Sequence, residues 1–177
     1  MKILIGYATT EGQTRKISRF CADALADLGH AVELIPLSEA SDLEVSRFDG
    51  AILAGSVHTH SYQKVLVDFA SDHAAALHER PTLFLSVSLS AAGNDSSDWA
   101  GLKSIVKDFV TETGWTPDRV EHVAGAFRFT EYDFLKSWAM RWIAKEKGEK
   151  IDAHGDTEYT DWDALRALMA DFSEAAE

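Results

Sequence analysis

A short polar turn near the N-terminus contains the residue types that bind an anion; it consists of Thr9, Thr10, Glu11, Gly12, Gln13 and Thr14. The turn follows an apolar run over residues 2–8 and precedes apolar residues at helical spacing, so it joins a predicted strand to a predicted helix. The first N–H groups of a helix have no partner within the helix, and the helix dipole favours negative charge there. Threonine hydroxyls add donors, and Gly12 lets the backbone come close to a ligand. We therefore expect this turn to bind a phosphate.

The charge of the turn limits the kind of phosphate it would bind. No lysine or arginine lies within it, although Arg15 and Lys16 follow, and it has neither the P-loop nor the three-glycine dinucleotide pattern. A phosphate held mainly by neutral donors suits the monoester of a flavin nucleotide better than a nucleoside triphosphate. The alternative is a helix cap without a ligand, in which Thr10 is the N-cap residue and Gln13 completes a capping box.

A second polar segment combines hydroxyls, imidazoles and an aromatic ring; it consists of Ser56, Val57, His58, Thr59, His60, Ser61 and Tyr62. A metal site is not expected, because His58 and His60 have no cysteine and no third ligand nearby. We expect these side chains to flank a planar ring, either through Tyr62 stacking on it or through an imidazole near one of its carbonyl groups. His58 and His60 are then weak candidates for proton transfer near neutral pH. The alternative for Tyr62 is that it only begins the next helix.

A third segment is small and polar; it consists of Ser86, Val87, Ser88, Leu89, Ser90 and Ala91. Its backbone N–H groups could bind the polar edge of a ring, such as the pyrimidine of a flavin. A mobile, solvated loop is the alternative interpretation.

Alternating apolar runs and helical patterns position these segments. The predicted strands span residues 2–8, 31–37, 50–56, 82–87 and 120–129. The predicted helices span residues 17–28, 62–77, 99–110 and 162–172, the last one capped by Asp161, with a short helix expected within 38–48. This alternation indicates an α/β fold with a parallel sheet covered on both faces. The three polar segments follow the first, third and fourth strands, where such sheets bind ligands.

Composition excludes several other classes of protein. The chain has 177 residues, which favours one domain, and its net charge of -12 argues against binding nucleic acid. Its single cysteine, Cys21, is predicted to be a buried core residue. No secretory signal and no apolar run of membrane-spanning length are found, so we expect a cytoplasmic protein, at most peripheral to a membrane.

The segment over residues 130–160 is too long for a simple connection between the last strand and the last helix. Phe134, Trp138 and Trp142 recur at intervals of four residues, with Lys136 and Arg141 among them. A basic, tryptophan-rich helix on an acidic protein is typical of an element that meets a membrane, an apolar substrate or a partner. The alternative is a helix that packs its tryptophans onto the domain.

Taken together, these segments resemble the flavodoxin-like proteins, and in particular the menaquinone-dependent protoporphyrinogen dehydrogenase family. The segment ATTEGQTRKIS resembles the flavodoxin phosphate loop. Four further segments resemble the protoporphyrinogen family: AGSVHTHSYQ, FLSVSLSAAG, WTPDRVEHVAGAFRFTEYDFLKSWAMRWI and TEYTDWDAL. The similarity covers essentially the whole chain, and the last third is its most distinctive part.

The resemblance implies a fold and a cofactor. The fold would be a single flavodoxin-like domain over residues 1–177, a three-layer sandwich whose five-stranded parallel sheet has the order 2-1-3-4-5, with an insert over residues 130–160. The cofactor would be FMN, with its phosphate at residues 9–14 and its isoalloxazine between residues 86–92 and 56–62.

The resemblance also implies an activity: oxidation of protoporphyrinogen IX to protoporphyrin IX in haem biosynthesis, with electrons passing through FMN to a membrane quinone, menaquinone or ubiquinone. The insert would contact substrate or the inner face of the cell membrane through Arg128, Lys136, Trp138, Arg141 and Trp142.

Other functions remain open from the residues alone. An FMN electron carrier of the flavodoxin type would suit the acidic composition, and an FMN quinone or azo reductase with a nicotinamide donor is a second flavin alternative. A receiver-type signalling domain is disfavoured, because the first strand ends in Gly6, Tyr7 and Ala8 instead of aspartates. A cofactor-free interaction domain would give a colourless protein that does not bind FMN.

Overall fold

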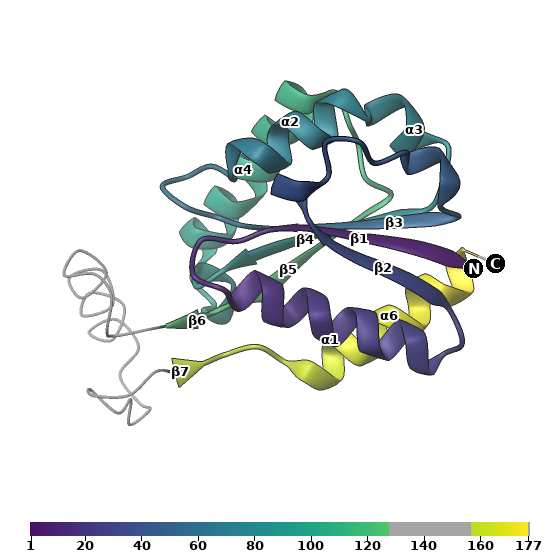
Figure 1. Ribbon diagram of the computed structural model, residues 1–177. Helices are drawn as coiled ribbons and strands as arrows, with labels where there is room; N and C mark the ends of the chain where they lie inside the picture. Colours follow the sequence, from purple (N-terminus) through teal and green to yellow (C-terminus); the bar gives the residue numbers. More distant parts are fainter. Residues whose placement is uncertain (128–156, 177) are drawn as a thin grey trace.

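The computed structural model describes residues 1–127 and 157–176, and its centre is a parallel sheet (Figure 1). The sheet has five strands in the order β2-β1-β3-β4-β5, which confirms the predicted topology. The strands are β1 (Lys2–Ala8), β2 (Ala31–Pro36), β3 (Gly50–Ser56), β4 (Thr82–Ser88) and β5 (Arg119–Ala124).

Helices cover both faces of the sheet. In Figure 1, α1 and α6 lie on one face, and α2, α3 and α4 lie on the other. The helices are α1 (Gln13–Asp27), α2 (Lys64–Asp72), α3 (Ala74–His78), α4 (Ser96–Thr113) and α6 (Trp162–Ala175). Short 3-10 turns occupy Leu37–Glu39, Val45–Arg47 and Ser90–Ala92. The arrangement is the three-layer sandwich that the sequence predicts.

The central strands are apolar throughout because both of their faces are buried. Successive side chains alternate between the two faces, so Ile3 and Ile5 pack with α1 and α6, whereas Leu4 packs in the other core. Cys21 is fully buried in the core beneath α1, as expected. Burial raises the pKa of its thiol to about 12.

An aromatic cluster fills the core on the α2 and α4 face. The rings of Phe84 and Phe109 stack with their centroids 4.9 Å apart, and Trp115 is fully buried against them. Just after Trp115, the Asp118 carboxylate accepts hydrogen bonds from the backbone N–H and the hydroxyl of Thr82, at 2.8 and 2.9 Å. The distinctive turn at residues 115–119 therefore ties the start of β5 to the start of β4.

The fifth strand differs from its predicted extent of residues 120–129. β5 ends at Ala124, and after Gly125 the chain forms a separate strand, β6 (Ala126–Phe127). This strand pairs antiparallel with β7 (Thr157–Glu158), at the end of the sheet where the parallel strands terminate (Figure 1). The chain just before the predicted insert thus pairs with residues near the end of that insert, as a two-stranded ribbon. Arg128, Lys136, Trp138, Arg141 and Trp142 lie outside the described residues.

Two helices also differ from their predicted boundaries. The helix predicted over residues 62–77 begins at Lys64 and is interrupted at His73, whose dihedral angles (φ -110°, ψ 12°) are not helical. The fourth helix begins before the predicted Trp99, because the Asp95 carboxylate caps it by accepting from the N–H groups of Ser97 and Asp98. Asp161 caps α6 as predicted, accepting from the N–H of Ala164 at 2.9 Å. Within the described ranges, no helix is both long enough and apolar enough to cross a membrane.

Candidate functional site

A cleft of about 550 Å³ lies at the carboxyl ends of β1, β3 and β4. This volume is within the range of small-molecule and cofactor sites. Parallel strands bring their carboxyl ends to one edge, so the three predicted polar segments meet there. The predicted residues that line the cleft are Thr9, Thr10, Glu11, Gln13, Thr14, Ser56, Val57, His58, His60, Val87, Ser88, Leu89 and Ser90.

Four predicted cofactor residues do not line the cleft: Gly12, Tyr62, Ser86 and Ala91. Tyr62 lies in the aromatic core, with its ring 5.1 Å from those of Phe84 and Phe109. Its hydroxyl shares a 2.7 Å hydrogen bond with the fully buried Ser86. Burial raises the pKa of Tyr62 to about 12, against the opposing effect of this hydrogen bond. The stacking predicted for Tyr62 is therefore wrong, because its side chain and that of Ser86 face the core.

One end of the cleft is the turn before α1, at residues 9–14, where the sequence predicts a phosphate; we call it the phosphate end. Gly12 has a φ of 89° and acts as the N-cap of α1, so the capping box based on Thr10 is also wrong. This left-handed conformation favours glycine. The N–H of Gly12 donates to Thr9 Oγ1 at 2.9 Å, which closes the turn and leaves the following N–H groups at the free end of the helix.

Thr14 provides a test of whether this turn suits a phosphate. Its side chain is only 1% exposed, and its Oγ1 has no hydrogen-bond partner among the described residues. A buried hydroxyl without a partner is costly unless a ligand satisfies it. Because Thr14 lines the cleft in the first turn of α1, an oxyanion bound there would accept its hydrogen. The turn therefore fits the phosphate of a flavin nucleotide.

Gln63 holds two of the site loops together, and the sequence analysis did not identify it. Its Nε2 donates to Thr10 Oγ1 at 3.0 Å and to Ser56 Oγ at 2.5 Å. These bonds join the turn after β1 to the segment after β3. Nothing local in the sequence marks Gln63, because its partners come from two other parts of the chain.

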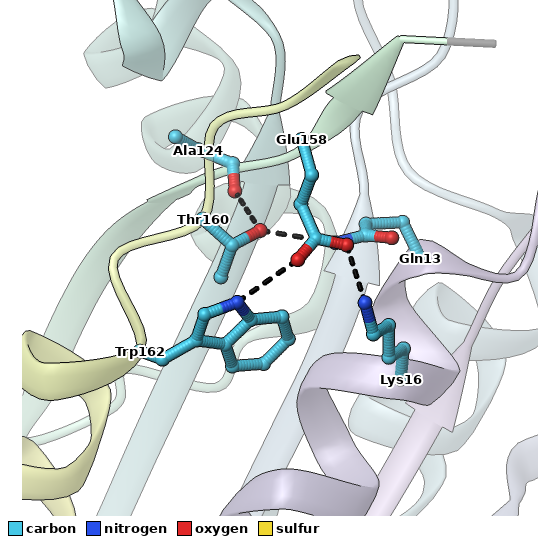
Figure 2. A network of polar contacts seen from close by, with 6 residues as sticks. All are labelled: Gln13, Lys16, Ala124, Glu158, Thr160 and Trp162. Carbon is cyan, nitrogen blue, oxygen red and sulfur yellow. Dashed lines mark hydrogen bonds and ion pairs between the residues drawn. The ribbon is translucent and has the colours of Figure 1, made fainter. Parts of the chain in front are cut away.

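A polar network connects the phosphate end to the ribbon of β6 and β7 (Figure 2). Glu158 Oε2 accepts from Lys16 Nζ at 2.5 Å and from Gln13 Nε2 at 3.3 Å, and its Oε1 accepts from Trp162 Nε1 at 2.9 Å. Thr160 accepts from Gln13 at 3.0 Å and donates to the carbonyl of Ala124 at 2.7 Å. Burial acts to raise the pKa of the Glu158 carboxyl, but the bonds from these donors outweigh it and lower that pKa.

The other end of the cleft is a tight turn between His58 and Ser61. The two residues exchange backbone hydrogen bonds of 2.8 and 3.0 Å. Between them, Thr59 and His60 have φ values of 46° and 66°, which residues other than glycine rarely adopt. Both side chains are exposed and line the cleft. Strain of this kind, at a ligand cleft, is a recurring feature of functional sites.

The first half of α4 forms a further wall that the sequence analysis missed. It contributes Ser97, Asp98, Gly101, Leu102 and Ile105. Leu102 and Ile105 are buried and provide apolar surface, and Asp98 adds a carboxylate close to the helix start. Asp95 caps the start of this helix, and the packing of α4 beside the sheet brings this face to the cleft.

The cleft thus has a helix N-terminus with an unpartnered hydroxyl, an apolar wall and a polar turn, which together suit a flavin nucleotide. In the described part of the chain, no three His, Cys, Asp or Glu side chains are grouped to hold a metal ion. A family model described as a flavodoxin domain matches residues 4–154. The chain belongs to the flavodoxin domain family. This membership implies a flavin cofactor.

Two relatives that match more than nine-tenths of this chain have a more specific name. The chain is 28% identical over 165 residues to the protoporphyrinogen IX dehydrogenase [quinone] of Escherichia coli, covering 93% of this chain and 91% of the relative. It is 26% identical to the protein of the same name from Leishmania major, covering 97% of this chain and 74% of the relative.

Solved structures support the fold. A short-chain flavodoxin associated with a bacterial microcompartment superposes with a TM-score of 0.61 at 12% identity, covering 100% of this chain and 99% of that one. Flavodoxin 1 from Bacillus cereus superposes with a TM-score of 0.55 at 12% identity, covering 98% of each chain. At this identity the likeness shows the flavodoxin fold alone.

Proposed function

We propose that this protein binds FMN in the cleft and oxidises protoporphyrinogen IX to protoporphyrin IX, with a membrane quinone as electron acceptor. The observation that carries the proposal is the similarity to quinone-dependent protoporphyrinogen IX dehydrogenases over 93% of the chain. The cleft adds support, because it has the donors for a phosphate monoester and the apolar surface for a flat ring system. The quinone is menaquinone or ubiquinone.

Three threonines hold the cofactor phosphate in this proposal. The hydroxyls of Thr9 and Thr10 accept hydrogen bonds from Gly12 N and Gln63 Nε2, which leaves their hydrogens to point at a ligand. Thr14 adds its buried hydroxyl, and the first N–H groups of α1 complete the set. When bound, FMN supplies the redox chemistry, while the protein supplies position and electrostatics.

The strained turn and the segment after β4 border the ring. His58 and His60 are exposed and line the cleft, and imidazole is the side chain that most often serves as a general acid or base. They are the proposed proton carriers for a reaction that removes hydrogen from the substrate. Val87 and Leu89 line the cleft from the opposite loop and exclude water from one side.

The insert is the proposed point of contact with substrate and membrane. Arg128, Lys136 and Arg141 would pair with the propionates of the porphyrinogen, and Trp138 and Trp142 would enter the membrane interface. The protein would then be cytoplasmic and peripheral on the inner face of the cell membrane.

Anaerobic turnover tests the proposal directly. FMN-loaded protein is mixed with protoporphyrinogen IX, with and without a menaquinone analogue, and porphyrin fluorescence is followed against a reaction without protein. Quinone-dependent formation of protoporphyrin above the background rate is expected. The variant His58→Asn/His60→Asn should keep FMN and lose rate. Equal rates with and without protein would refute the activity.

A flavodoxin-type electron carrier is the second candidate, and the net charge of -12 favours it. An acidic surface around a flavin suits docking to basic redox partners. Tight FMN binding without porphyrinogen turnover, together with reduction by a flavodoxin reductase, would support this alternative. An FMN quinone reductase would instead oxidise an added nicotinamide donor when the quinone analogue is present, without forming protoporphyrin.

A further inference from the structure

A lysine lies near the phosphate end of the cleft, and its ammonium group is paired with other side chains of the protein. Lys16 lies in the second turn of α1, and its Nζ is 2.5 Å from Glu158 Oε2. The same ammonium lies over the Trp162 ring, 5.1 Å from its centroid. Lys16 is therefore held between a carboxylate and an aromatic face, and it does not line the cleft.

The side-chain amide of Gln13 is also hydrogen-bonded within the protein, although Gln13 lines the cleft. Its amide nitrogen has two hydrogens, and it donates to Thr160 at 3.0 Å and to Glu158 at 3.3 Å. Since Glu158 Oε2 also binds Lys16, the ammonium and a cleft-lining amide meet at one oxygen (Figure 2). Both hydrogens of the Gln13 amide are therefore used within the protein, and the Lys16 charge is paired with a carboxylate.

The backbone fixes Glu158 in this position. It lies opposite Ala126 in the ribbon of β6 and β7, and Ala126 lines the cleft. Next to it, the N–H of Tyr159 donates to the carbonyl of Gly125 at 3.1 Å, and Thr160 donates to the carbonyl of Ala124. The ribbon thus holds the carboxylate of Glu158 beside Gln13, although the two residues are 145 positions apart in the chain.

These contacts determine the local charge at the predicted phosphate site. Thr9, Thr10 and Thr14 are neutral donors, and the cleft-lining acidic side chain at this end is Glu11. With Lys16 neutralised by Glu158, the local charge does not favour a dianion. Ligands with more phosphate charge would be repelled more strongly.

We propose that Glu158 is a specificity-determining residue. By pairing with Lys16 and Gln13, it withholds positive charge from the phosphate site. The site then accepts a phosphate monoester through neutral donors and disfavours polyphosphate esters. This inference rests on the proposed FMN site but not on the proposed substrate.

Flavin titrations of the flavin-free protein test the inference, because riboflavin is FMN without its phosphate. Affinities are measured by quenching of flavin fluorescence for wild type, Glu158→Gln, Lys16→Met and the double variant. Removing one negative charge near a dianion should tighten FMN binding by about three- to tenfold at low ionic strength, and removing the Lys16 charge should weaken it by a similar factor. The double variant should match wild type, and riboflavin affinity should change less than about twofold in every variant.

Salt dependence and a matched control variant distinguish an electrostatic effect on FMN affinity from a structural effect of the substitution. The gain of Glu158→Gln should disappear in about 1 M KCl, where the Debye length falls to about 3 Å. Asp68→Asn removes a carboxylate from the exposed Lys64–Asp68 pair on α2, outside the cleft, and should change neither affinity.

Two outcomes would overturn the inference, and they differ from failure of the proposed function. If Glu158→Gln weakens FMN and riboflavin equally, the network only supports the fold. If wild type binds FMN no better than riboflavin, the phosphate site itself is wrong. If Glu158→Gln does not fold, Lys16→Met and the double variant still test the inference. The double variant should then bind FMN more tightly than Lys16→Met, because it lacks the Glu158 charge. Porphyrinogen turnover does not enter any of these measurements.

Discussion

The two ends of the cleft are built in different ways. At the phosphate end, Gly12 occupies the one position with a left-handed backbone, and Gln63 and Glu158 tie the turn to other strands. At the opposite end, Thr59 and His60 adopt left-handed conformations without being glycine, and both side chains are exposed.

This difference corresponds to two kinds of ligand contact. A cofactor that stays bound benefits from a relaxed, cross-linked site, because pre-organisation reduces the entropy lost on binding. A turn that retains strained, exposed side chains costs stability, and such a cost persists where the side chains have a function. We therefore expect the first end to determine FMN affinity and the second to determine turnover.

The largest expected effect is that of Thr14→Val at the phosphate end. Losing a hydrogen bond to a charged phosphate should weaken FMN binding by about 10- to 100-fold. The flavin-free protein should be no less stable, since the lost hydroxyl has no partner among the described residues. Flavin titration and urea unfolding measure the two quantities.

The conservative variant Thr14→Ser is the control, and it should restore most of the FMN affinity. An equal loss of riboflavin affinity in Thr14→Val would contradict the assignment of this hydroxyl to the phosphate.

The next effect concerns the strained turn. Thr59→Asn together with His60→Gly installs the pair favoured where both central residues have positive φ. The free energy of unfolding should rise by about 1 to 2 kcal/mol, while FMN affinity changes less than about threefold. Turnover of protoporphyrinogen should fall, because the side chains at the mouth of the cleft are lost.

His60→Ala retains the strain and removes the imidazole, so it should lose turnover without gaining stability. A double variant that is more stable and fully active would show that the side chains of this turn serve no purpose in the reaction.

The smallest expected effect is the pH dependence of the Glu158 network in the flavin-free protein. The folded-state pKa of Glu158 is lowered from its usual 4.5, so its contribution is present above that pH and is lost as the pH falls through the folded value. Glu158→Gln should therefore lower the free energy of unfolding by about 0.2 to 1 kcal/mol at pH 7 and by nothing measurable at pH 3. Urea unfolding at both pH values gives the comparison. An equal loss at both would mean that packing, not charge, is responsible.

Much of the fold could be predicted because it depends on local patterns. β1 and β3 match their predicted bounds, since a strand buried on both faces is a continuous apolar run. The caps at Asp161 and Gly114 also act locally. The end of β5 was missed because the chain leaves the sheet after Ala124 and pairs with Thr157 and Glu158, more than 30 residues further along the chain. A pattern in one segment does not show such a partner.

The site divides in the same way. The turn at residues 9–14 was correctly placed in a cleft because strand, glycine and helix start are adjacent in the chain. Tyr62 and Ser86 were placed there too, yet both side chains point into the core. Ser86 lies on the core face of β4, because successive side chains of a strand alternate between its faces, and Tyr62 is hydrogen-bonded to it. Gln63 and Asp98 were missed because their neighbours at the cleft come from other elements.

The sequence by itself determined the parallel α/β sheet, the order of its elements and the location of a polar turn at the start of a helix, because apolar periodicity and helix-end chemistry act over a few residues. Only the tertiary structure decided which polar groups remain available to a ligand. Lys16 and Gln13 look free in the sequence, but Glu158 engages both across 142 and 145 residues. Hydrogen bonds and charge pairs depend on distances of a few ångströms, which folding sets and chain position does not.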